Sequence, residues 1–161
     1  MNIGRSLVWN VLKAWIRIKF PGVQQMAIAK LAQQLQQPGS SKPLLLDART
    51  PEEFEVSHLP NAHRVERSML TDPDQLPLAE DTTGAIVVYC SVGYRSAQFA
   101  QALQTLGYQN VFNLEGSLFE WVNQGYPVYH ITTDGMEHET QAVHPYNATW
   151  GLLLEGKESG E

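Results

Sequence analysis

The chain has almost no cysteine. Of its 161 residues only Cys90 carries a thiol, so no disulfide can form within the chain. A reducing compartment is therefore the expected setting, and we predict a cytoplasmic protein. The same scarcity leaves Cys90 without a second thiol in the chain that could resolve it after oxidation or sulfur uptake. Sulfur chemistry at Cys90 must therefore end on an acceptor outside the chain.

Positive charge is also scarce over most of the sequence. The chain has 11 Lys and Arg against 17 Asp and Glu, which gives a net charge of −6. Residues 1–50 have the opposite charge balance, because Asp47 is their single acid and they contain several Lys and Arg residues. Nucleic-acid-binding domains usually present a basic surface with aromatic side chains that stack on bases. The acidic main body therefore argues against nucleic acid as a partner.

No hydrophobic run is long enough to span a bilayer. Residues 1–20 have helical periodicity, but charges interrupt them, and they lack the cleavage pattern of a secretory signal. One interpretation is a basic amphipathic helix that makes peripheral contact with an anionic membrane. The interpretation we favour is a helix whose apolar face packs on the domain or on a second subunit, because apolar stripes usually mark buried faces. The expected apolar face consists of Ile3, Leu7, Val11, Trp15 and Ile18.

The histidines show no spacing typical of a metal site. His58 and His63 do not have the spacing of a ligand pair on a helix, and His130, His138 and His144 add no compact cluster. We therefore interpret the histidines as structural and expect neither a metal nor a cofactor.

After Pro21, short apolar runs alternate with helical patterns. Alternation of this kind predicts an α/β fold with parallel strands and helices on both faces of the sheet. Thr50 is the expected N-cap of one helix, with Pro51 in its first turn and Glu53 completing a capping box. The expected strands are 42–49, 61–67, 85–90 and 110–116, and the expected helices are 23–37, 50–59, 96–108 and 117–128.

Cys90 lies where a strand ends, and loop 91–95 leads from it into a helix. Backbone N–H groups of such a loop can converge into an anion-binding nest at the positive end of the helix dipole. Gly93 permits backbone conformations that a Cβ would hinder, and Ser96 is the expected N-cap. Arg95 adds a permanent positive charge suited to oxyanions. We therefore predict that Cys90 is a thiolate nucleophile that attacks an anionic substrate.

Two stretches of the chain carry a resemblance to a known family. The first, "LLLDARTPEEFEVSHLPNAHRV", contains a strand-Asp-x-Arg, a Glu-Phe and a His-x-Pro-x-Ala motif. The second, "IVVYCSVGYRSAQFAQALQTLGYQNVFNLEGSLFEWVNQGYPV", contains a cysteine loop, a helix and a closing Gly-Ser and Trp segment. In their order and spacing they resemble a rhodanese-type sulfurtransferase domain, from about Val23 to Val128.

The resemblance implies a rhodanese-like α/β fold with a mainly parallel, five-stranded sheet and helices on both faces. With the amphipathic N-terminal helix, the expected organisation is a basic helix over 1–20, a rhodanese-like domain over 21–129 and a C-terminal extension over 130–161.

The activity that the resemblance implies is a double displacement. Cys90 would take a sulfane sulfur from a small anionic donor such as thiosulfate and become a persulfide. Cyanide, a small thiol or a protein thiol would then accept the sulfur. Arg95 is the candidate for binding a sulfonate, although Ser91 stands where a basic residue is common in the family. The expected substrate-binding residues are Ser91, Val92, Gly93, Tyr94, Arg95 and Ser96.

Two other functions stay open at this point. Phosphatases and arsenate reductases share the fold, but their loop is one residue longer, whereas Arg95 follows Cys90 by five positions. The other alternative is a non-catalytic sulfur-delivery or interaction module. Asp47 and Arg49 either line the rim of the pocket or, as we favour, fix a loop through hydrogen bonds or an ion pair with Glu53.

Overall fold

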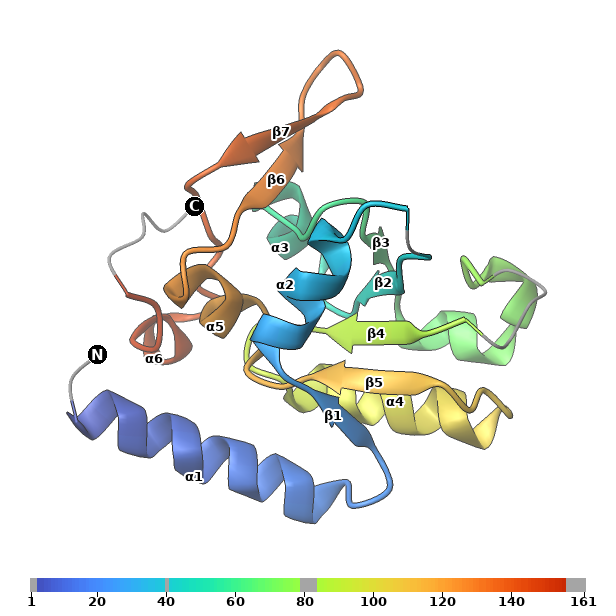
Figure 1. The fold of residues 1–161 in the computed structure, drawn as a ribbon, viewed down its shortest axis with the longest axis horizontal. Coiled ribbons are helices and arrows are strands. Elements are labelled where there is room, and N and C mark those ends of the chain that lie inside the picture. The colour runs from blue at the N-terminus through green and yellow to red at the C-terminus, as the bar shows by residue number, and fades with distance from the viewer. Residues whose placement is uncertain (1–2, 40, 79–83, 156–161) are drawn as a thin grey trace.

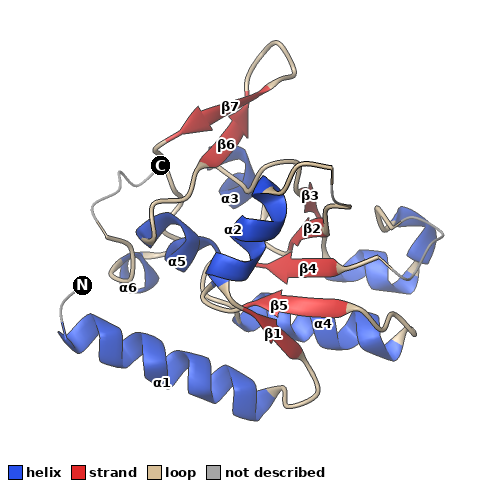
Figure 2. Ribbon diagram, viewed as in Figure 1, coloured by secondary structure: helices blue, strands red, loops and turns tan. Residues whose placement is uncertain are grey.

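A parallel five-stranded sheet forms the centre of the protein (Figure 1; Figure 2). The computed structural model describes residues 3–39, 41–78 and 84–155. The strand order is β1-β5-β4-β2-β3. The central strand β4 is buried along its whole length, as its continuous apolar sequence predicts. The strands are β1 (Gln24–Met26), β2 (Leu44–Asp47), β3 (His63–Arg64), β4 (Ile86–Tyr89) and β5 (Val111–Leu114).

Helices cover both faces of this sheet. In the view of Figure 1, α2 lies in front of the sheet and α4 lies behind it. The α/β fold, the parallel five-stranded sheet and its two helical layers are therefore confirmed. The helices are α1 (Ile3–Lys19), α2 (Ile28–Gln36), α3 (Pro51–Val56), α4 (Tyr94–Thr105), α5 (Ser117–Asn123) and α6 (Ala148–Gly151), with short 3₁₀ turns at Arg67–Thr71 and Pro73–Gln75.

The first edge of the sheet differs from the prediction, which placed one helix over 23–37. Residues 24–26 form β1 instead, and α2 begins only at Ile28. Strand β1 pairs in parallel with β5, with Met26 opposite Leu114. A strand this short has no alternating pattern that could distinguish it from a helix, so its pairing with β5 decides its conformation.

An antiparallel hairpin follows the sheet and lies mostly in the region expected as a C-terminal extension. Strands β6 (Val128–Ile131) and β7 (Glu137–Thr140) form it, and it projects from the domain in Figure 1. His58 holds its base, because His58 exchanges backbone hydrogen bonds with Tyr129 and its Nε2 lies 3.0 Å from Glu137 Oε1. His58 is therefore structural in this fold.

Helix α1 packs on the domain through a different face from the one expected. Its buried side chains are Trp9, Leu12 and Ile16. Ile3 and Ile18, on the face predicted to be inward, are 90% and 78% exposed. The helix is apolar over more than half of its circumference, so periodicity alone identified a face but not the one that contacts the domain.

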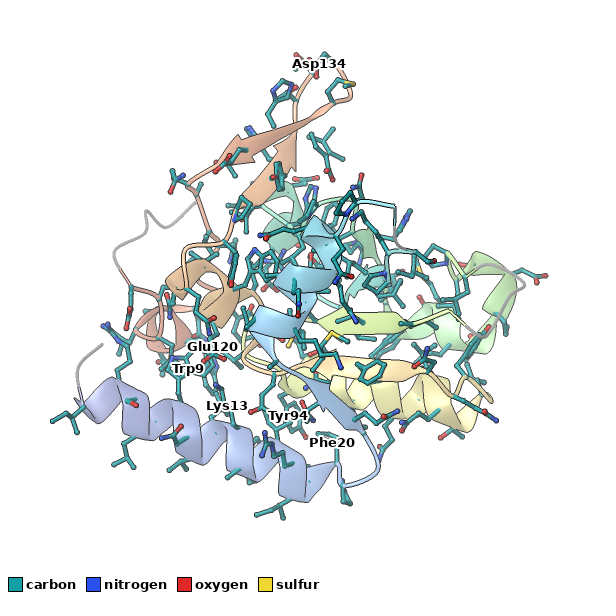
Figure 3. The ribbon with its side chains drawn as sticks, viewed as in Figure 1. Trp9, Lys13, Phe20, Tyr94, Glu120 and Asp134 are labelled. Carbon is teal, nitrogen blue, oxygen red and sulfur yellow. The ribbon has the colours of Figure 1, made fainter. Side chains whose placement is uncertain are left out.

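Polar contacts fix this orientation of α1. Lys13 Nζ lies 2.6 Å from Glu120 Oε1 on α5, and Figure 3 shows the two side chains meeting beside Trp9. Phe20, just beyond the end of the helix, packs edge-on against Tyr94 at the start of α4.

Among the described residues, no helix is long and apolar enough to cross a membrane.

Candidate active site

Cys90 lies at the carboxyl end of β4, where its sulfur faces backbone and hydroxyl donors. The side chain is 1% exposed. Its Sγ accepts a hydrogen bond from the Gly93 N–H at 3.1 Å and lies 3.3 Å from Ser96 Oγ. The Cys90 N–H donates to Ser117 Oγ at 3.2 Å. Donors directed at the sulfur stabilise negative charge on it, which is the arrangement that a nucleophilic thiolate needs.

The cysteine loop turns into α4 at Gly93. This residue has φ +113°, in the left-handed region that glycine adopts without strain. The helix begins directly afterwards, at Tyr94, so the first N–H groups of α4 lie within the loop. The expectation that Ser96 caps this helix is therefore wrong: Gly93 is the N-cap, and Ser96 lies inside the first turn.

Two residues that the sequence did not single out hold the loop in place. Asn113 on β5 accepts a hydrogen bond from Ser96 Oγ at 2.6 Å and donates to the Gly93 carbonyl at 3.1 Å. Ser117, at the start of α5, links the Cys90 N–H to the Leu114 carbonyl. Only the parallel pairing of β4 with β5 brings these side chains to the loop, so no local motif could have identified them.

A network around Glu53 anchors the other side of the loop. Arg95 makes a two-pronged ion pair with the Glu53 carboxylate, with Nη1–Oε1 at 2.7 Å and Nη2–Oε2 at 3.0 Å. Ser91 Oγ donates to Glu53 Oε2 at 2.9 Å and accepts from Arg95 Nη2 at 3.0 Å. The first and last side chains of the loop therefore share one buried carboxylate.

The charges of this network stabilise each other. Burial opposes ionisation of Glu53, but its hydrogen bonds and charge interaction with Arg95, together with Arg49 and Ser91, lower its pKa from 4.5 to about 2. Burial likewise opposes the charge of Arg95, yet Glu53 and the thiol of Cys90 raise the pKa of this guanidinium above its usual value. Both groups therefore stay ionised at neutral pH.

The capping box of α3 holds the Glu53 carboxylate at the N-terminal end of this helix. The sequence predicted Thr50 as N-cap with Glu53 three residues later, and the structure confirms both reciprocal hydrogen bonds. The Glu53 side chain therefore accepts a hydrogen bond from the Thr50 N–H at the start of α3 and also pairs with Arg95 after the cysteine.

Asp47 and Arg49 do not reach the rim of the pocket. Both are buried, and Arg49 Nη2 lies 2.7 Å from Asp47 Oδ2 and 2.6 Å from the Ser57 carbonyl. The ion pair that we favoured with Glu53 is not the one observed, because Arg49 pairs with Asp47 and the direct ionic partner of Glu53 is Arg95.

A cavity of about 210 Å³ opens over the cysteine. Cys90 and four residues of the segment 91–95 line it, and the rest of its wall is largely aromatic. Trp15 of α1 stacks on Tyr94 with ring centroids 5.1 Å apart, and Tyr146 covers the Arg95 guanidinium at 4.5 Å. The lining residues are Leu12, Trp15, Cys90, Ser91, Val92, Tyr94, Arg95, Tyr146 and Trp150.

The described residues contain no group of three or more His, Cys, Asp or Glu side chains that could hold a metal ion. On the side of the cysteine loop, the cavity is lined by Cys90 and by Arg95 with its paired guanidinium, and the Gly93 N–H is directed at the sulfur.

Comparison with known proteins connects this site with sulfur transfer. Residues 28–124 match the profile of the rhodanese-like domain family. An uncharacterised protein of Synechocystis sp. is 38% identical over 98 residues, which are 61% of this chain and 52% of that protein. A sulfurtransferase of Allochromatium vinosum is 33% identical over 86 residues, 53% of this chain and 77% of that protein. A rhodanese-related protein from Thermoplasma volcanium has a crystal structure with a TM-score of 0.54 and 28% identity, covering 65% of this chain and 96% of that one.

The match leaves part of each protein unaccounted for. The chain spans about half the length of the Synechocystis relative that it matches. Within this chain, α1, the β6–β7 hairpin and α6 lie outside residues 28–124.

Proposed function

The chain belongs to the rhodanese-like domain family, and from this premise we propose that it moves a sulfane sulfur through a persulfide on Cys90. The observation that carries the proposal is the Gly93 N–H directed at Cys90 Sγ at the base of the cavity. The division into a basic helix over 1–20, a catalytic domain over 21–129 and an extension over 130–161, and the cytoplasmic setting, belong to the same proposal.

The reaction consists of two displacements. The Cys90 thiolate attacks the sulfane sulfur of an anionic donor such as thiosulfate, and a new S–S bond forms at Sγ. The S–S bond of the donor breaks, and its electron pair leaves with the remaining fragment, which is sulfite when the donor is thiosulfate. An acceptor thiolate then attacks the outer sulfur of the persulfide, takes it as an acceptor persulfide and releases the Cys90 thiolate.

The residues around Cys90 support both steps. The Gly93 N–H stabilises charge on Sγ when the thiolate forms and when it is released. The first N–H groups of α4 provide donors for the outer sulfur of the persulfide. The Glu53 network holds Ser91 and Arg95, so the loop does not need to reorganise during the reaction.

Intact-mass spectrometry tests this proposal directly. Wild-type protein treated with thiosulfate should gain the mass of one sulfur atom, and cyanide should remove it with formation of thiocyanate. The Cys90→Ser variant should gain nothing under the same conditions. Wild-type protein that stays unmodified with thiosulfate and with organic sulfane donors alike would show the proposal to be wrong.

A second candidate function rests on the outer face of α1. Ile3, Leu7, Val11 and Ile18 are exposed along it, and such a face favours contact with a membrane surface. Lys13 and Arg17 are paired with Glu120 and Glu115, so apolar insertion rather than basic charge should provide most of the binding.

Vesicle flotation tests this membrane contact. Wild-type protein should float with vesicles of phosphatidylcholine as well as with vesicles that contain phosphatidylserine. The double variant Leu7→Gln/Ile18→Gln should not float, because both substitutions replace an apolar side chain of this face with a polar one. Equal flotation of the two proteins, or flotation of neither, would contradict the membrane contact.

A further inference from the structure

The wall of the active-site cavity opposite the cysteine loop is built by segments outside the family match. Leu12 and Trp15 come from α1, and Tyr146 and Trp150 come from the C-terminal segment. All four lie outside residues 28–124, which contain the cysteine loop itself. The fold of the family therefore provides the reactive sulfur, whereas this chain's own ends provide the surface that a substrate contacts above it.

That surface is apolar and carries flat rings. Trp15 lies parallel to Tyr94, with an angle of 10° between the ring planes, and about half of Trp15 remains exposed. Tyr146 lies over the guanidinium of Arg95. Aromatic side chains bind other aromatic groups by offset stacking or edge contacts, in addition to the burial of apolar area.

The charge in the cavity favours a singly charged ligand over a doubly charged one. Arg95 is the cation among the lining residues, and both of its terminal nitrogens donate to the Glu53 carboxylate. A dianion such as thiosulfate would have to lose water against aromatic walls with no unpaired lining cation among the described residues. A monoanion can place its charge at the N–H groups of the loop and its apolar part against the rings.

We propose that this site selects a singly charged sulfane donor that carries an aromatic group, such as an aryl thiosulfonate, over thiosulfate. The inference rests on the sulfur transfer proposed above and names its donor class. The size of the cavity agrees, because a cavity of about 150 Å³ accommodates benzene and this one measures about 210 Å³. One ring and the transferred sulfur therefore fit together above Cys90.

The first displacement then has a defined balance. The Cys90 thiolate attacks the terminal sulfur of the thiosulfonate, and the Sγ–S bond forms. The bond between that sulfur and the sulfonyl sulfur breaks, and its electron pair leaves with the aryl sulfinate. The total charge is unchanged and no proton moves.

Single-turnover rates of persulfide formation test the donor class. We would compare benzenethiosulfonate, methanethiosulfonate and thiosulfate, each rate divided by that of the same donor with a small alkyl thiol in solution. Wild-type protein should prefer benzenethiosulfonate over methanethiosulfonate roughly ten- to hundredfold, the range that burial of one ring provides. Thiosulfate should react more slowly than either.

Variants of the wall assign this preference to the aromatic side chains. Trp15→Ala and Trp150→Ala should each reduce this preference severalfold, measured as the ratio of the normalised rates with benzenethiosulfonate and methanethiosulfonate. Trp15→Phe should restore most of it, since a ring remains. Ile18→Ala is the matched control, because it removes an exposed apolar side chain from the same helix and lies outside the cavity.

Each outcome has a distinct meaning. A wild-type preference near one, or a preference that both Trp→Ala variants keep in full, would overturn the aromatic-donor inference while leaving sulfur transfer standing. Absence of a persulfide with all three donors would overturn the proposed function, and the inference would fall with it.

Discussion

Glu53 is the residue on which the most contacts of the site converge. It completes the N-terminal capping box of α3, accepts from Ser91 and forms the two-pronged ion pair with Arg95. A buried ion pair costs desolvation energy, and removal of one partner leaves the other charge uncompensated. The network therefore makes the geometry of the cysteine loop depend on the ionisation of one carboxyl group.

The first prediction at this scale concerns acid stability. The pKa of Glu53 falls from 4.5 to about 2 on folding, so its stabilisation is complete above about pH 4.5 and is lost as the pH falls toward about 2. By linkage, this contribution is on the order of 3 kcal/mol. The free energy of unfolding of the wild type, measured with urea, should decrease by about this amount as the pH falls from about 4.5 to about 2.

Glu53→Gln mimics the protonated carboxyl group and provides the comparison. It should be less stable than wild type by a similar amount at pH 7 and nearly equal to it at pH 2. Glu52→Gln, a change at an exposed neighbour in the same helix, is the control and should follow the wild-type curve. A Glu53→Gln protein with the wild-type pH dependence would contradict the assignment.

A second prediction separates backbone strain from chemistry at Gly93. Gly93 and Gly107 have φ of +113° and +105°, so alanine at either position should cost about 1–2 kcal/mol of stability. Only Gly93 donates its N–H to Cys90 Sγ. Gly93→Ala should therefore also slow persulfide formation, whereas Gly107→Ala should lose stability alone. Equal rates for the two variants, measured by stopped flow, would show that the backbone conformation of residue 93 does not control persulfide formation.

At the scale of elements, α1 contributes to three parts of the molecule. Its inner face packs Trp9, Leu12 and Ile16 against the domain, and Trp15 at the margin of that face lines the cavity. Its outer face is also apolar but remains exposed. One helix therefore belongs to the core, to the substrate site and to an external surface.

Two leucines of α1 test which face holds the helix. Leu12 is 8% exposed and Leu7 is 62% exposed. Leu12→Ala should destabilise the protein by about 2–3 kcal/mol, because it removes buried apolar volume. Leu7→Ala should change the stability by less than about 0.5 kcal/mol. Thermal or urea unfolding measures both, and the reverse order would mean that α1 packs through the face first expected from the sequence.

At the scale of the whole molecule, α1 contacts the C-terminal segment around α6. Arg5 Nε donates to the Leu152 carbonyl, 147 positions later in the sequence. Asn123, the last residue of α5, donates to the Leu153 carbonyl and accepts from the Glu155 N–H. The C-terminal segment is therefore attached both to α1 and to the domain, and these attachments position Tyr146 and Trp150.

Asn123 tests this attachment. Asn123→Ala removes both hydrogen bonds to the C-terminal segment and should cost about 1–2 kcal/mol. Hydrogen exchange should quicken in residues 148–154 but not in β4, because the change loosens one segment and leaves the sheet intact. Gln124→Ala, at the neighbouring position, is the control. Unchanged exchange in residues 148–154 would mean that other contacts hold the segment.

Short-range sequence patterns determined much of this protein. The continuous apolar run of β4 and the capping box from Thr50 to Glu53 are local, so the sequence alone placed both of them correctly. It also placed Cys90 directly after the strand and Gly93 in the turn, but it set the start of the following helix two residues too late. The α/β alternation is local as well, and it determined the parallel sheet with helices on both faces.

Tertiary structure decided what depends on contacts between distant segments. The conformation of residues 24–26 came from pairing with β5, and the inward face of α1 came from the surface that receives it. The partner of Arg95 is 42 positions away, and the aromatic wall of the cavity joins the two ends of the chain. Periodicity reports which residues share a face, but only packing against the rest of the chain determines what that face contacts.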